Sequence, residues 1–328
     1  MSILEAYWPS SRSEFGKILV DSYEKFDTDF IIRSALMLYG DVVKSNINKG
    51  IAETLKNDWS EFKRALKNLV RLLLKIDVRH FLSSWNVLLP IIYYIYYNLE
   101  YRNNIKAVRA YLLRAIFFTY FQSGTTGKLQ QMKSYINSFD HEITIEMLDQ
   151  INDLRVTEGE IEDVLNSEKG SRVAGEVLYY MSLDWRNKSF KYEQDHLHPA
   201  SRFDNSKPHT ISMDVWKKWR SMRNKLPNLH LLEGRSNGSK NDIRLIDYYN
   251  DMNNEQKARF HEVQTFQTMF RLNLETSKSF MKSARKFLQQ RFVRCLDHRG
   301  SVKSLIYKQS VRNYTLSSQF QYGVGIKN

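Results

Sequence analysis

The chain has 328 residues, 42% of them hydrophobic, with only 13 glycines and 5 prolines, which allows two folded domains and excludes a disordered or fibrous protein. A single cysteine, Cys295, excludes an internal disulfide and a thiolate metal cluster, and favours a reducing compartment. The formal net charge of +13 disfavours a cationic partner and favours a polyanionic one.

The first half of the sequence is predicted to be a helix bundle. Apolar and aromatic residues recur there at helical spacing, and no alternating run rich in Val, Ile and Thr appears before residue 187. Asp27 and Asp29 are typical N-cap residues, Gly40 is a usual helix stop, and Gly124 is expected to close another helix. Helices are predicted over residues 28–39, 58–76, 84–99, 103–122, 129–138, 144–154, 158–166 and 170–183.

The most apolar stretch, residues 87–97, is too short to span a bilayer and contains Pro90. We interpret it as a buried core helix. The N-terminus lacks the basic and then apolar layout of a signal peptide. We therefore expect a cytoplasmic protein that has no membrane partner.

The pattern changes near residue 187. Two short segments are predicted as strands, residues 190–194, which lead into Asp195-His196, and residues 228–232. The tail from Gly300 has no clear period. Helices are predicted over residues 212–225, from Asn237 or Ser239 through 249, and over 262–296.

Positive charge is concentrated in the second part of the chain. Residues 1–185 carry 22 Lys and Arg against 24 Asp and Glu, whereas residues 186–328 carry 27 against 12, a balance of +15. Such a split favours a nucleic-acid partner for the second part, the alternative being a solvated basic surface. The helix over 212–225 supplies the candidate DNA-binding residues Lys217, Lys218, Arg220 and Arg223.

A motif with a specific chemistry lies between residues 193 and 240. Residues 193–199 read Glu-Gln-Asp-His-Leu-His-Pro, residues 227–232 read Pro-Asn-Leu-His-Leu-Leu, and residues 237–240 read Asn-Gly-Ser-Lys. An Asp-His pair entering a strand, a second strand that begins with Asn, and an Asn-x-x-Lys helix start, in that order, resemble the HNH (ββα-metal) nuclease motif. The resemblance implies an endonuclease that uses Mg²⁺ or Mn²⁺.

The resemblance also assigns a role to each residue of the motif. His196 would be the general base, because histidine exchanges protons near neutral pH. Asp195 and Asn237 would be the metal ligands, since both supply hard oxygen donors suited to Mg²⁺ or Mn²⁺. Asn228 would hold the loop behind the histidine by hydrogen bonds, and Lys240 would meet a phosphate oxygen.

His198 has two interpretations. It would lie on the same side as His196 if the strand continued, and it would then contact the metal or a phosphate. We prefer a structural histidine beside Pro199. A zinc site built from His196, His198 and His230 is a further alternative.

Two regions together resemble the C-terminal part of GmrSD-type restriction proteins, which are type IV, modification-dependent enzymes. The HNH unit resembles their nuclease domain, and the helices that contain Asp29-Phe30-Ile31-Ile32-Arg33 and residues 88–94 resemble the helical region before it. The resemblance implies a mainly α protein with a small α+β unit. It would comprise a helical domain over 1–168, an HNH domain with flanking helices over 169–298, and a tail of uncertain structure over 299–328.

Full-length members of that family begin with a nucleotide-dependent, ParB-like domain bearing Asp-Gly-Gln-Gln-Arg, a motif not found in this sequence. We therefore expect the effector part of an anti-phage restriction system, which cleaves or nicks DNA and has a separately encoded ParB-like subunit as a candidate partner. The alternatives are a non-catalytic DNA-binding or docking subunit with a vestigial HNH fold, and an RNA-cleaving toxin. Four tyrosines are interpreted either as a docking face or as ordinary core: Tyr93, Tyr94, Tyr96 and Tyr97.

Overall fold

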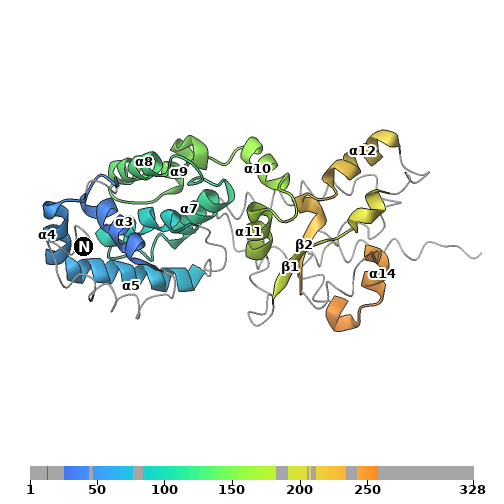
Figure 1. Ribbon diagram of the computed structural model, residues 1–328, viewed down its shortest axis with the longest axis horizontal. Helices are drawn as coiled ribbons and strands as arrows, with labels where there is room; N and C mark the ends of the chain where they lie inside the picture. Colours follow the sequence, from blue (N-terminus) through green and yellow to red (C-terminus); the bar gives the residue numbers. More distant parts are fainter. Residues whose placement is uncertain are drawn as a thin grey trace, which may run out of the picture. The chain divides into compact units, whose positions relative to one another are not determined.

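The fold comes from a computed structural model, which describes residues 13, 26–43, 47–76, 84–181, 191–204, 207, 212–233 and 242–257. The chain divides into two compact units, residues 1–160 and 161–328, and the division falls inside helix α10, Glu158–Leu165. The architecture is mainly helical with one small antiparallel sheet (Figure 1), as the sequence predicted. The predicted domain boundaries at 168 and 298 stay predictions.

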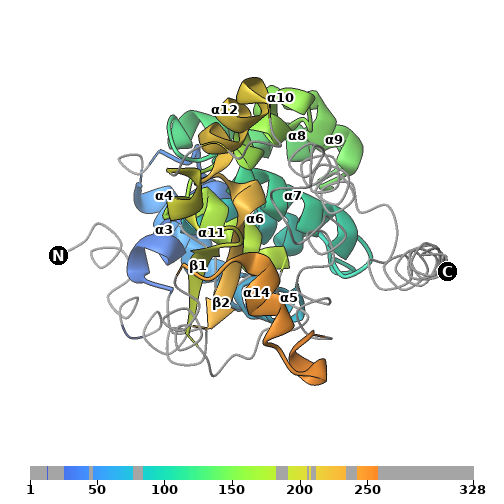
Figure 2. The same cartoon turned by 90° about the vertical axis from the view of Figure 1, so that its right-hand side faces the viewer.

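The first unit is helical throughout its described elements (Figure 2). Helix α6 (Leu89–Tyr97) is almost entirely apolar, and it packs against α3 (Thr28–Tyr39), α5 (Trp59–Ile76) and α8 (Thr125–Ser138). The stretch over residues 87–97, which was predicted to be a buried core helix, therefore lies in the core. The α-helices of this unit are α3 Thr28–Tyr39, α4 Lys49–Asn57, α5 Trp59–Ile76, α6 Leu89–Tyr97, α7 Ile105–Phe117, α8 Thr125–Ser138 and α9 Ile145–Gln150, with 3₁₀ helices η3 Trp85–Leu88 and η4 Asn152–Leu154.

Helix α3 has the predicted bounds because its capping residues are where the sequence predicted them. The Asp27 carboxylate accepts the amide hydrogen of Phe30 at 2.8 Å, and Gly40 follows the last turn. Asp29 is not an N-cap as predicted. It lies in the first turn, where its carboxylate pairs with Arg33 at 2.7 Å, one turn along the helix.

Several helices of the first unit differ from the prediction. The predicted helix over 84–99 is broken, because Ser84 caps a 3₁₀ turn and α6 begins only at Leu89. The helix predicted over 103–122 ends at Phe117, and Thr119 has a positive φ of 51°. Gly124 does not close that helix; at φ 64° it is instead the N-cap of α8. Helix α4 was not predicted.

Burial bears on the two interpretations of the four tyrosines. Tyr93 and Tyr94 are buried, so the four tyrosines do not form a common exposed face. The hydroxyl of Tyr93 donates to Asn137 at 2.6 Å, and that of Tyr94 donates to the backbone carbonyl of Tyr101 at 3.0 Å. These bonds satisfy the two hydroxyls inside the core.

The second unit is built around a two-stranded antiparallel sheet of β1, Tyr192–His196, and β2, Leu229–Glu233. Asp195 pairs with His230, and His196 pairs with Leu229. Helix α11 (Arg172–Met181) packs against β2 (Figure 1). The remaining elements are α11 Arg172–Met181, η5 Ala200–Phe203, α12 Met213–Met222, η6 Leu226–Asn228 and α14 Leu245–Asn250.

Two small apolar clusters lie in the described part of this unit. The connection between the strands has its own cluster, formed by Phe203, Trp216, Trp219 and Met222. The turn after β1 packs on α14, where Leu197 and Leu245 are buried with Tyr248, Tyr249 and Met252 against them. Helix α14 is thereby fixed beside the end of β1.

The bounds of these elements shift from their predictions by a few residues. Both strands lie slightly later than predicted, and α12 is shorter than the predicted 212–225. The described residues just before α14 are not helical, so that helix starts later than Asn237 or Ser239, both of which lie outside the described residues. The helix predicted over 262–296 and the tail also lie outside them. None of the described helices has the length and apolar character needed to cross a membrane.

Candidate active site

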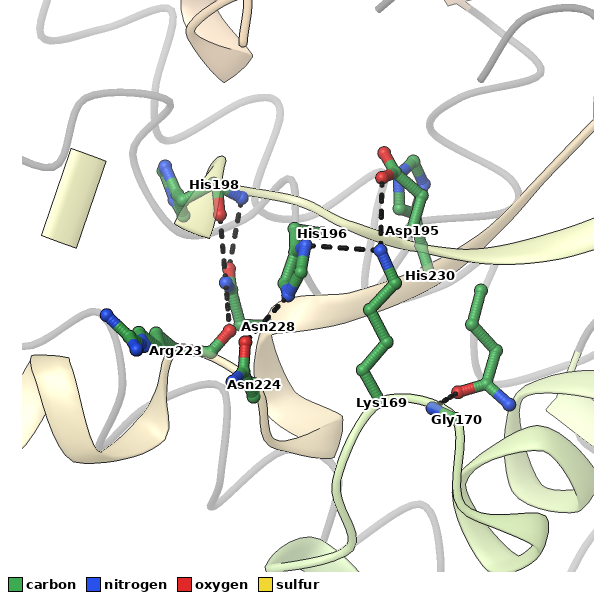
Figure 3. Close-up of polar contacts among 10 residues, drawn as sticks. Lys169, Gly170, Asp195, His196, His198, Arg223, Asn224, Asn228 and His230 are labelled. Carbon is green, nitrogen blue, oxygen red and sulfur yellow. Dashed lines mark hydrogen bonds and ion pairs between the residues drawn. The ribbon is translucent and has the colours of Figure 1, made fainter. Parts of the chain in front are cut away.

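His196 is the last residue of β1, and both of its ring nitrogens have a polar partner (Figure 3). Nε2 lies 3.0 Å from Oδ1 of Asn224, and Nδ1 lies 3.3 Å from Nζ of Lys169. Because an amide oxygen only accepts, Nε2 carries the ring hydrogen of the neutral imidazole. Nδ1 then keeps its lone pair, which faces the lysine ammonium.

Asp195 lies beside His196 and is largely buried, with 13% of its side chain exposed. Its Oδ2 lies 3.3 Å from Nε2 of His230, its partner on β2, and its Oδ1 lies 3.9 Å from Nζ of Lys169. Burial raises the pKa of Tyr248 on α14, and the charge of Asp195 raises it further. The Asp195 carboxylate therefore lies beside β2, and its charge acts on Tyr248 of α14.

Neighbouring residues of a strand normally send their side chains to opposite faces. Asp195 and His196 nevertheless both reach the ammonium of Lys169, because that group lies near the end of the strand (Figure 3). A single group at this place can therefore be contacted by the carboxylate and by the imidazole.

Asn228 clamps the backbone just after His196. Its Oδ1 accepts the amide hydrogen of His198 at 3.0 Å, and its Nδ2 donates to the carbonyls of His198, at 2.9 Å, and Arg223, at 2.7 Å. The backbone carbonyl of Asn228 also accepts from the Leu197 amide at 2.8 Å. The side chain is fully buried, so these bonds are made without competition from water.

Lys169 and Asn224 are held by backbone pairing between two segments. The amide of Lys169 donates to the carbonyl of Asn224 at 2.7 Å, and the amide of Leu226 donates to the carbonyl of Ser167 at 2.8 Å. Glu168 and Lys225 form the bridge between these bonds. The residues on either side of the His196 ring are thus tied to each other as well as to the ring.

The strand ends at His196, so His198 is not carried onto the same face by a continuing strand. The His198 side chain is 3% exposed, and its backbone is held by Asn228. Among the described residues, no group of three His, Cys, Asp or Glu side chains is arranged to hold a metal ion. The zinc alternative built on His196, His198 and His230 gains no support from this.

Asn237 and Lys240, predicted as metal ligand and phosphate contact, lie outside the described residues. Of the predicted DNA-binding residues, three are exposed on α12, and the apolar face of that helix is buried. Arg223 differs from the others because it forms an ion pair with Asp204. The three exposed residues are Lys217, Lys218 and Arg220.

The motif did not indicate two residues that contact His196. Lys169 precedes the motif in the chain, and Asn224 lies in the connection between the strands, so no spacing rule links either residue to the histidine. Gln194, on β1, is a third residue that was missed. Its Oε1 accepts from the Gly170 amide at 2.8 Å, and so it ties the Lys169 turn to the strand.

The chain was also compared with known proteins. No protein-family model matches the sequence, and no curated protein is significantly similar to it.

Proposed function

We propose that the chain is a metal-dependent endonuclease of the HNH type that cleaves or nicks DNA. The observation that carries the proposal is the arrangement around His196, which has one ring nitrogen fixed by Asn224, the other beside Lys169, and the backbone just after it clamped by Asn228. This arrangement suits a histidine that must present a lone pair in one fixed direction.

Phosphodiester hydrolysis requires a base for water. The water oxygen attacks phosphorus, one phosphorus–oxygen ester bond breaks, and the proton of the water passes to Nδ1 of His196. Asn224 supports this transfer by holding the Nε2 hydrogen, so that the imidazolium formed keeps its orientation. The leaving oxygen takes its proton from solvent.

Of the two proposed metal ligands, Asp195 is a described residue. The Asp195 carboxylate is a hard oxygen donor. The Lys169 ammonium already lies 3.9 Å from its Oδ1, so the space beside the carboxylate accommodates positive charge. Asp195 and Asn237 would hold Mg²⁺ or Mn²⁺. When bound, such an ion supplies charge neutralisation on the phosphate and stabilises the leaving oxygen.

DNA is the proposed substrate because the excess positive charge belongs to residues 186–328, the part that contains His196. The exposed cations of α12 belong to the same unit. RNA would be bound through the same phosphate chemistry, and a ribonuclease is the outcome that a parallel assay on RNA would reveal. A non-catalytic binding subunit remains the second candidate, and the ordered partners of His196 favour the enzyme over it.

We further propose that this nuclease is the effector part of an anti-phage restriction system and works with a separate, nucleotide-dependent ParB-like subunit. The support is the resemblance of the HNH unit and of the preceding helices to GmrSD-type restriction proteins. Co-purification with the products of neighbouring genes tests the partner, and infection assays with each gene deleted singly test the role. Full protection by this chain alone would contradict the split arrangement.

The central test is nicking of supercoiled plasmid with and without Mg²⁺. We expect Mg²⁺-dependent nicking by the wild type and a loss of about 10²–10⁴-fold in His196→Ala, as for removal of a general base. His141→Ala, in the helical unit, is the matched control and should keep the wild-type rate. Equal nicking by His196→Ala and wild type would rule out this mechanism.

A further inference from the structure

We infer that Lys169 is a substrate contact of this site and binds a non-bridging oxygen of the phosphate group that is cleaved. The inference rests on the proposed function, and it adds a residue from outside the HNH motif. It concerns the turn between α10 and α11, which contains Lys169, a lysine that contacts His196.

The position of the ammonium is the first argument. Nζ lies 3.3 Å from the His196 nitrogen that would take the proton of water, and 3.9 Å from the Asp195 carboxylate that would hold the metal. A phosphate attacked by water activated at Nδ1 must come within one water molecule of that nitrogen. It would then lie within reach of the Lys169 ammonium.

The second argument is that the turn is built to hold this lysine in place. The Lys169 amide is bonded to the Asn224 carbonyl, and the next amide, that of Gly170, is bonded to Oε1 of Gln194 at 2.8 Å. Gly170 has a φ of 84°, a conformation that side-chain-bearing residues rarely adopt. The backbone is therefore fixed on both sides of Lys169, and only the side chain is left to move.

The third argument is that the ammonium can change partners at little cost. Its ion pair with Asp195 is long, and its other partner is a neutral ring nitrogen. The Lys169 side chain is 36% exposed, so a ligand can approach it from solvent. Lys225 of the same unit differs from Lys169, because its ammonium is bonded at 3.1 Å to the amide oxygen of Asn166, a residue outside the site.

Release of Nδ1 is also required by the chemistry. While Nδ1 accepts from the ammonium, its lone pair cannot take a proton from water. A phosphate oxygen is a stronger acceptor than a neutral imidazole, because it carries charge. Transfer of the ammonium to the phosphate would therefore free the base in the same movement that neutralises negative charge on the substrate.

The test uses the full chain and supercoiled plasmid under single-turnover conditions, with enzyme in excess and Mn²⁺ saturating. Lys169→Met and Lys169→Gln remove the charge with little change in length, and Lys169→Arg keeps it. Lys191→Met is the matched control, because that exposed lysine lies just before β1 and its substitution removes the same charge. The cleavage rate constant, the Kd for DNA, the Mn²⁺ half-saturation and the thermal midpoint are measured for each variant.

We expect the rate constant to fall about 10²-fold in Lys169→Met and Lys169→Gln, as for the loss of one transition-state donor. Lys169→Arg should recover part of it, and Lys191→Met should equal the wild type. DNA affinity and Mn²⁺ half-saturation should change less than about threefold, since the other cations that bind DNA phosphates remain in place.

Three results would overturn the inference. A wild-type rate in Lys169→Met and Lys169→Gln means that the lysine does not touch the reacting phosphate. If these variants cleave at an unchanged or faster rate and need less Mn²⁺, the ammonium only occupies the position of the metal ion. A loss of rate together with loss of the folded state in both variants means that the role is structural. If wild type and His196→Ala cleave equally, the proposed function itself fails, which is a different outcome.

Discussion

Asn228 makes three side-chain hydrogen bonds at zero exposure, and all three go to backbone groups. The two bonds with His198 are buried, so their removal would leave buried backbone groups without their partner. Its position between the end of β1 and the start of β2 makes it the link that fixes the loop after His196.

Asn228→Ala should lower the free energy of unfolding by roughly 2–3 kcal/mol, because an unsatisfied buried group costs about 1–3 kcal/mol. Urea unfolding followed by circular dichroism measures the change. Asn250→Ala, at an exposed position on α14, is the control and should stay within about 0.5 kcal/mol of the wild type. A neutral effect of Asn228→Ala would mean that the clamp contributes nothing to stability.

Asp195→Ala and Asn237→Ala should each raise the concentration of Mn²⁺ required for half-maximal binding. The reason is that each substitution removes one hard oxygen donor from the proposed ligand pair. Calorimetric titration of the full chain with Mn²⁺ measures this directly. Unchanged binding in both variants would show that any bound metal lies elsewhere.

The sequence predicted only those site residues whose chemistry and order in the chain match the HNH motif. Asp195, His196 and Asn228 were identified because their spacing matches a motif, and the structure brings these three together at one end of the sheet. Lys169 and Asn224 could not be predicted, because their contacts with His196 depend on pairing of segments far apart in the chain.

At the scale of elements, α11 approaches β1 at Gly175. A Cβ added there would lie 2.8 Å from Nε2 of Gln194, which is closer than real contacts allow. The atom in the way is the end of a flexible side chain, so the helix itself need not move. Gln194, however, holds the Gly170 amide and would have to shift.

Gly175→Ala should therefore leave the thermal midpoint nearly unchanged while it loosens the turn that carries Lys169. Alanine favours the helix by up to about 1 kcal/mol, which offsets the crowding. Hydrogen exchange at the Gly170 amide should become faster. Gly159→Ala in α10 is the control, since its Cβ would meet only Thr157 at an ordinary 3.6 Å. Unchanged exchange in Gly175→Ala would mean that Gln194 does not hold the turn.

Helical periodicity predicted most elements of the first unit, because one buried face dictates the spacing of apolar residues. Helix α4 was missed because it buries only Ala52 and Leu55, too few residues for a clear period. The prediction of one helix over 84–99 was wrong for a different reason. Its residues 87–95 are all buried, so they carry no alternation that could reveal the change from 3₁₀ to α at Leu89.

At the scale of the whole molecule, charge distinguishes the two parts of the sequence. Residues 1–185 have a balance of −2, and residues 186–328 have +15. DNA affinity should therefore depend on cations of the second part and fall steeply with salt. The ion pair between Arg223 and Asp204 leaves the exposed residues Lys217, Lys218 and Arg220 as the main candidates on α12.

Neutralising Lys217, Lys218 and Arg220 together should flatten the plot of log K against log salt by about 0.9 for each phosphate that these side chains neutralise. Fluorescence anisotropy with a labelled duplex, from about 50 to 200 mM salt, measures the slope. The control removes three exposed cations from the first unit, Lys56, Lys67 and Arg71. Equal slopes in the two triple variants would contradict the assignment of DNA binding to α12.

The partners of His196 come from separate stretches of the chain, and the last of them is synthesised late. Lys169 precedes β1, whereas Asn224 and the whole of β2 follow the long connection. Ribosomes deliver a chain from its N-terminus, and its domains fold as their residues become available. A product that stops before residue 224 lacks the oxygen that holds Nε2 of His196 and also lacks the partner strand. Translation itself would thus keep incomplete chains from carrying an assembled site.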